Sequence, residues 1–168
     1  MKKIFFLSFI VVFAAQIFAQ KTPKHEQFHV PIETVTAKQI NFTGNRKARQ
    51  FRTNLKEALA AGKINFAGKF IIAEWGCGSG CTQAEIIDAQ TGKVFFPNVL
   101  WQSISGSISV GEHERIEYKA DSRLLIITGY AGINGGDSDK FKHGIFYLEW
   151  TGTNLKLLKF TRKPLYTS

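Results

Sequence analysis

The only two cysteines of the chain, Cys77 and Cys81, lie in the segment EWGCGSGCTQ, with three small residues between them. A thiol pair at this spacing can form a disulfide, ligate a metal, or carry redox or nucleophilic chemistry. The N-terminal segment, described below, predicts export into an oxidising compartment, and two cysteines are the number that one bridge requires. We therefore expect a Cys77–Cys81 disulfide. Closing so short a loop stabilises a fold by only about 2 kcal/mol, so the bridge would mainly shape a turn.

The alternative keeps both thiols free and makes the protein a metal-binding or thiol-based enzyme or redox protein. A metal site or a nucleophile with its base then needs a histidine, and His113 and His143 are the candidates. This alternative requires a histidine nitrogen within about 4 Å of a cysteine sulfur. A redox dithiol is disfavoured, because a glycine separates Trp75 from Cys77 and a strand, rather than a helix, is expected to follow the pair.

A second region with chemical potential is the polar, glycine-rich segment GYAGINGGDSDKFKHG at residues 129–144. A hairpin loop of this length is often functional, although its oxygen ligands do not follow the calcium-loop pattern. Together with the cysteine turn, it gives the expected binding surface. The residues assigned to that surface are Glu74, Trp75, Ser79, Asn134, Asp137, Asp139 and His143.

The N-terminus predicts an exported protein. Residues 1–19 form a secretory signal peptide, with Lys2 and Lys3 before an apolar run and Ala19 as a small residue for cleavage. No cysteine lies near the cleavage site, so we do not expect a lipoprotein, and no later apolar run is long enough to span a membrane. The mature chain is expected in the periplasm or outside the cell.

The basic charge favours an anionic partner. The formal net charge is +9, and it falls to about +7 once Lys2 and Lys3 are removed. Arg49, Arg52 and Lys56 share one flank of an expected helix and form a candidate anion-binding flank. The expected partner is a protein or an anionic component of the cell envelope rather than a nucleic acid. No catalytic residue, cofactor or bound metal is assigned.

The remaining chain divides into an N-terminal arm, residues 20–44, and a single domain, residues 45–168. One amphipathic helix is expected in NRKARQFRTNLKEALAAG, residues 45–62, with an apolar stripe of Phe51, Leu55 and Leu59. Three hairpins follow, centred near residues 91, 121 and 152. These patterns predict an α+β fold in which the helix packs on one antiparallel β-meander of about seven to eight strands.

The segment INFAGKFIIAEWGCGSGCTQAEIIDAQTGKVF, residues 64–95, together with SRLLIITG at residues 122–129, resembles a family of small exported bacterial proteins with an NFAG…WGCGxGC motif. The resemblance implies an exported single domain and carries no catalytic residue over to this chain. Because the sequence also lacks a recognisable catalytic constellation, the leading hypothesis is a non-enzymatic binding or accessory module.

Overall fold

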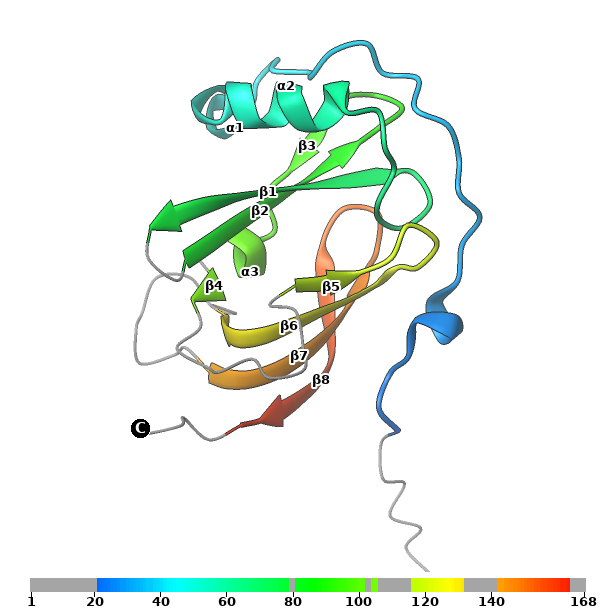
Figure 1. The fold of residues 1–168 in the computed structure, drawn as a ribbon, viewed down its shortest axis with the longest axis vertical. Helices are drawn as coiled ribbons and strands as arrows, with labels where there is room; N and C mark the ends of the chain where they lie inside the picture. Colours follow the sequence, from blue (N-terminus) through cyan, green and yellow to red (C-terminus); the bar gives the residue numbers. More distant parts are fainter. Residues whose placement is uncertain (1–20, 79–80, 102–103, 106–115, 132–141, 164–168) are drawn as a thin grey trace, which may run out of the picture.

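The computed structural model describes residues 21–78, 81–101, 104–105, 116–131 and 142–163, and these residues form a mostly β structure (Figure 1). Two antiparallel sheets account for most of it. The first sheet contains β1 (Phe70–Gly78), β2 (Cys81–Asp88) and β3 (Val94–Phe95). The second contains β5 (Ile116–Tyr118), β6 (Leu124–Ala131), β7 (Lys142–Trp150) and β8 (Leu155–Arg162). The two-residue strand β4 (Ile104–Ser105) pairs with both β2 and β6 and so links the sheets.

The predicted single β-meander with one helix is wrong. The strand order is β1-β2-β4-β6-β7-β8, with β3 branching from β2 and β5 from β6. After β3 the chain does not extend the first sheet but enters the second one. The physical reason is that β2 is buried on both faces: Ala84 and Ile86 face the second sheet, and Ile87 faces the helices. A local hairpin pattern fixes strand pairing, but it does not say which face of a sheet receives the next one.

The predicted helix is present but interrupted. It forms α1 (Arg46–Gln50) and α2 (Arg52–Ala60), with Phe51 between them at φ −110°. Asn45 is the N-cap, as the sequence predicts, because its side-chain oxygen accepts a hydrogen bond from the backbone amide of Ala48 at 3.0 Å. Two shorter elements complete the set: the 3-10 helix η1 (His25–Phe28) and α3 (Asn98–Trp101).

The layers enclose two apolar cores. One lies between the two sheets and includes Phe66, Phe146 and Trp150. The other lies between the outer face of the first sheet and the helix pair and includes Leu55 and Leu59. In Figure 1 α1 and α2 cover one face of the first sheet, and the second sheet lies on its other face.

The N-terminal arm is fastened along the body of the domain. From residue 21 it runs past the β5–β6 turn and the first sheet before reaching α1 (Figure 1). Its backbone amides donate hydrogen bonds to carbonyl oxygens of the domain; the donor–acceptor pairs are Val30–Asp121, Glu33–Gly68, Thr36–Ala89, Ala37–Ala89 and Asn41–Gly92. The start of the arm is held by His25, whose Nε2 lies 3.2 Å from Oε1 of Glu117. The arm is thus part of the folded unit.

Candidate functional site

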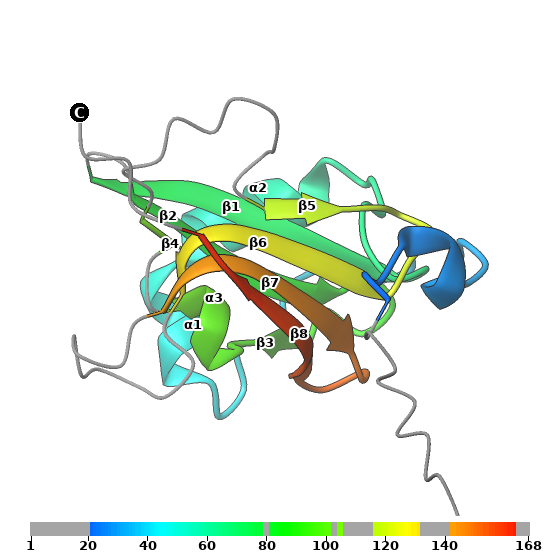
Figure 2. The ribbon, with the colours of Figure 1, turned by 90° about the horizontal axis from the view of Figure 1, so that it is seen from below.

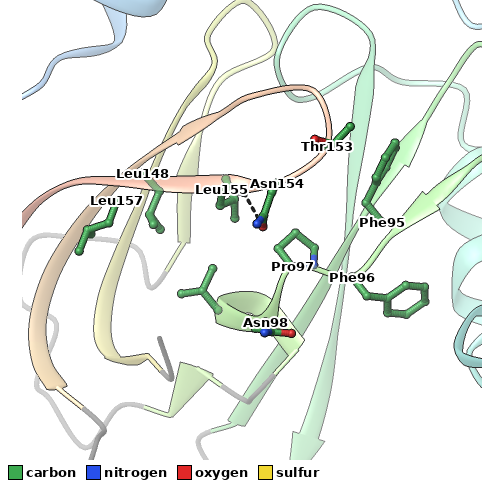
Figure 3. Close-up of a pocket in the computed structure, with 10 residues that line it drawn as sticks. Phe95, Phe96, Pro97, Asn98, Leu148, Thr153, Asn154, Leu155 and Leu157 are labelled. Atoms are coloured by element: carbon green, nitrogen blue, oxygen red, sulfur yellow. Dashed lines mark hydrogen bonds between the residues drawn. The ribbon is translucent and has the colours of Figure 1, made fainter. Parts of the chain in front are cut away.

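An open cleft lies where the two sheets separate, between the β3–α3 segment and the β7–β8 hairpin (Figure 3). Its volume is about 380 Å³. The walls are mostly apolar, with three polar side chains at the rim. The apolar lining residues are Phe95, Phe96, Pro97, Val99, Leu148, Leu155 and Leu157, and the polar ones are Asn98, Thr153 and Asn154. A concave apolar surface with few polar groups is the usual form of a binding site.

The topology explains why the sandwich is open here. β3 and β4 both pair with the edge of β2 that faces away from β1, but only β4 continues into the second sheet. β3 is two residues long, and the second sheet ends in β8. Figure 2 shows β8 beside β7 in the second sheet. Within the described residues no strand connects β3 with β8. The inter-sheet core therefore reaches the surface along β8.

Aromatic packing holds the wall of the cleft in place. The ring of Phe95 meets Trp150 edge-to-face, with centroids 5.4 Å apart, and meets Phe70 in the same way at 6.3 Å. Across the cleft, Leu157 is 39% exposed. Among the described residues, Ile32 is the one other large hydrophobic side chain that is comparably exposed. Leu157 therefore adds exposed apolar surface at the mouth of the cleft.

The polar rim is set by the turn between β7 and β8. Thr151 donates from its backbone amide and its hydroxyl to the carbonyl oxygen of Asn154, at 3.0 and 2.9 Å. The side-chain oxygen of Asn154 accepts from the amide of Leu155 at 2.9 Å. These bonds fix the turn, so Thr153 and Asn154 are held at the cleft. Figure 3 shows Asn154 facing Pro97 across it.

Strand β8 is strongly basic. In the strand register, Lys156 lies opposite Glu149 of β7, and Lys159 lies opposite Tyr147. Both lysines are on the outer face of the sheet, away from the cleft. The sequence has no acidic residue after Glu149. The four cations of this segment are Lys156, Lys159, Arg162 and Lys163. Strand β8, next to the cleft, therefore carries a net positive charge.

The structure separates two residues that the sequence analysis assigned to one surface. The Glu74 carboxylate accepts a hydrogen bond from the Tyr118 hydroxyl at 2.6 Å, on the side of the second sheet. Trp75 lies on the opposite side of β1, stacked on Phe51 with ring centroids 4.9 Å apart, and its Nε1 donates to Gln83 at 3.2 Å. Consecutive strand residues point to opposite faces, so these two side chains do not share one binding face.

The other sequence-predicted residues are only partly described. Cys77 lies at an irregularity of the β1–β2 hairpin, where Gly76 pairs with Thr82 and Gly78 pairs with Cys81. His143 is buried, and its Nδ1 donates to the carbonyl oxygen of Lys163 at 2.7 Å. The described part of the chain contains no group of three or more His, Cys, Asp or Glu side chains that could hold a metal ion. The remaining predicted residues, Ser79, His113, Asn134, Asp137 and Asp139, lie outside the described residues.

A functional group that the sequence analysis missed is Glu85. Its side chain is fully buried, and neither carboxylate oxygen has a hydrogen-bond partner in the described structure. It pairs in register with Ala73 and shares a face with Ile87, toward the helices. Burial raises the pKa of Glu85 from 4.5 to about 9, while the nearby charge of Lys47 acts in the opposite direction. The sequence did contain a signal for the burial of Glu85. In the run AEIID, residues 84–88, the alternation of a strand places Glu85 on the same face as the apolar Ile87.

Within the described residues, no helix is long and apolar enough to cross a membrane. Comparisons of the chain with protein-family models, with curated proteins and with solved structures found no match. The family resemblance therefore stays a prediction, and the argument for a function must come from the geometry of the site.

Proposed function

We propose that the protein is an exported, non-enzymatic binding module whose ligand is an extended acidic peptide segment. The segment lies along the cleft, beside β8, and places an apolar side chain in it. The observation that carries this proposal is the position of the cleft, which opens directly beside a sheet edge. The proposal that the protein is exported, to the periplasm or out of the cell, is based on the predicted signal peptide.

An apolar anchor suits this cleft physically. A concave, mostly apolar surface buries a side chain that enters it, and the few polar groups at its rim orient the ligand. Leu155 and Leu157 alternate along β8 and both line the cleft. One apolar side chain buried there contributes about 1.5 to 3 kcal/mol.

Charge selects the partner. The cations of β8 discourage a second copy of the same strand, because like charges would meet along the edge. The same cations attract a strand with acidic residues and speed its encounter with the protein. An acidic partner protein of the cell envelope fits this surface, and its binding should weaken as the salt concentration rises.

The cleft is tested by a pair of matched substitutions. Leu157→Ser should weaken binding of a fluorescein-labelled nonapeptide, built from threonine and glutamate around a central leucine, by about tenfold, because it removes half of the apolar contact. Ile32→Ser is the control, since Ile32 is 58% exposed and does not line the cleft. Fluorescence anisotropy gives both affinities. Equal affinities for the two variants would contradict the proposed site.

We further propose that Cys77 and Cys81 form the disulfide of the β1–β2 turn. The register supports it, because Gly78 pairs with Cys81 and brings the neighbouring Cys77 close to it. The described residues include no free cysteine. In the mass of the intact mature protein, the cysteines should take up an alkylating reagent only after reduction. Labelling without reduction would instead support the alternative of functional thiols with a histidine.

A further inference from the structure

A second pocket, polar rather than apolar, lies between the N-terminal arm, the β2–β3 turn and α1. Its volume is about 520 Å³. It lies apart from the cleft, with which it shares no lining residue. The residues that line it are Gln39, Ile40, Asn41, Phe42, Thr43, Arg49 and Thr91. Arg49 belongs to the anion-binding flank that the sequence predicts, and here it meets a set of neutral polar groups.

The floor of this pocket is held by tight contacts. Asn41 donates from its backbone amide to the carbonyl oxygen of Gly92 at 2.9 Å, and Ile40 is buried beneath the surface. The amide of Thr43 donates to the side-chain oxygen of Asn41 at 3.0 Å, and the hydroxyl of Thr91 accepts from the amide of Lys93 at 3.3 Å. Polar groups that are already fixed lose little freedom when a ligand arrives.

The residues that line this pocket favour a ligand that carries both a negative charge and hydroxyl groups. Arg49 is the one charged residue among the residues described as lining the pocket, and no carboxylate is among them to compete with an anion. Two amide side chains and two hydroxyls also line the pocket, together with Phe42, whose partly buried ring packs against the core. A guanidinium binds a planar carboxylate in a two-pronged manner, amides and hydroxyls exchange hydrogen bonds with sugar hydroxyls, and an aromatic ring packs on C–H groups.

We propose that this pocket binds an acidic sugar, with the Arg49 guanidinium on the sugar carboxylate and the Asn41, Thr43 and Thr91 side chains on the ring hydroxyls. On a surface that attracted anions by charge alone, each cation would contribute about equally to the binding affinity. Arg52 and Lys56 are exposed on the same flank but do not line the pocket. We therefore expect Arg49 to contribute to the binding affinity, and Arg52 and Lys56 to contribute little.

The test uses isothermal titration calorimetry on the full mature chain with a tetrasaccharide of alternating glucuronic acid and N-acetylglucosamine. Wild type should bind it, Arg49→Gln should bind it about tenfold more weakly, and the control Arg52→Gln should stay within about twofold of wild type. A neutral tetrasaccharide of N-acetylglucosamine should bind at least about tenfold more weakly than the acidic one. Because both arginines are exposed, neither variant is expected to change the thermal unfolding midpoint.

Several outcomes would overturn the proposal. Equal losses in Arg49→Gln and Arg52→Gln would show non-specific attraction to a basic surface. Equal binding of the acidic and neutral tetrasaccharides would remove the role of the carboxylate. Displacement of the acidic tetrasaccharide by an equal concentration of sodium sulfate would reduce the pocket to a simple anion site. An absence of heat with the acidic tetrasaccharide at millimolar concentration, at two temperatures 15 °C apart, would reject the ligand class.

Discussion

Replacing Glu85 with glutamine is expected to raise the free energy of unfolding at pH 7.5 by roughly 3 to 4 kcal/mol, with little change near pH 5. The wild-type carboxyl has a pKa of about 9 in the folded protein and 4.5 as its ordinary value. Between these values the folded chain keeps a proton that the unfolded chain releases. A rise in pH therefore favours the unfolded state, by about 1.4 kcal/mol for each pH unit in this window.

The measurement is urea unfolding of both proteins at several pH values between 5 and 8. The contribution of wild-type Glu85 is fully present below pH 4.5 and is lost as the pH rises toward 9, so the gap between the proteins should widen steadily. Glutamine is a close isostere that cannot ionise, which leaves packing nearly unchanged. Glu57→Gln, at an exposed position of α2, is the control and should show no widening gap. A gap that stays constant with pH would mean that Glu85 titrates normally.

The second large effect is expected at Gly92, where alanine should lower the free energy of unfolding by roughly 3 kcal/mol or more. Gly92 has φ +70°, which strains any other residue, and a Cβ atom there would overlap the backbone oxygen of Gln39. The arm could then no longer lie against the β2–β3 turn. The hydrogen bond from Asn41 to Gly92 would be weakened as well.

Gly44 provides a matched control for this substitution. Its φ is +67°, and a Cβ atom there would meet nothing within 4 Å. Gly44→Ala should therefore cost only the backbone strain, about 1 kcal/mol. Chemical denaturation of the two variants separates strain from the clash with the arm. Equal destabilisation would show that docking of the arm contributes little to stability.

Local structure was largely predictable from the sequence. Asn45 caps the helix as expected, Leu55 and Leu59 are buried, and Thr151–Asn154 is the turn between β7 and β8. These features depend on residues close together in the chain, where side-chain type and spacing determine the outcome. The break at Phe51 was not predicted, because it accompanies a stacking contact with Trp75 on a distant strand.

The site was not predictable in the same way. The cleft brings together Phe95, Leu148 and Leu157, which are up to 62 positions apart, and it exists only because the two sheets stack and leave one side open. No periodicity within a single strand carries that information. Glu74 and Trp75 show the opposite error. Their adjacency in the sequence suggested one surface, whereas the pleat of β1 places them on different faces.

The most direct test of the proposed function is amide hydrogen exchange of the protein with and without the acidic leucine nonapeptide. If the peptide fills the cleft, backbone amides of residues 95–99 and 153–157, which contain most of its lining, should gain protection, because bound peptide disfavours local opening there. The amides of α2, on the far side of the first sheet, should be unchanged. Protection that appears only away from these residues, or none at saturating peptide, would contradict binding in this cleft.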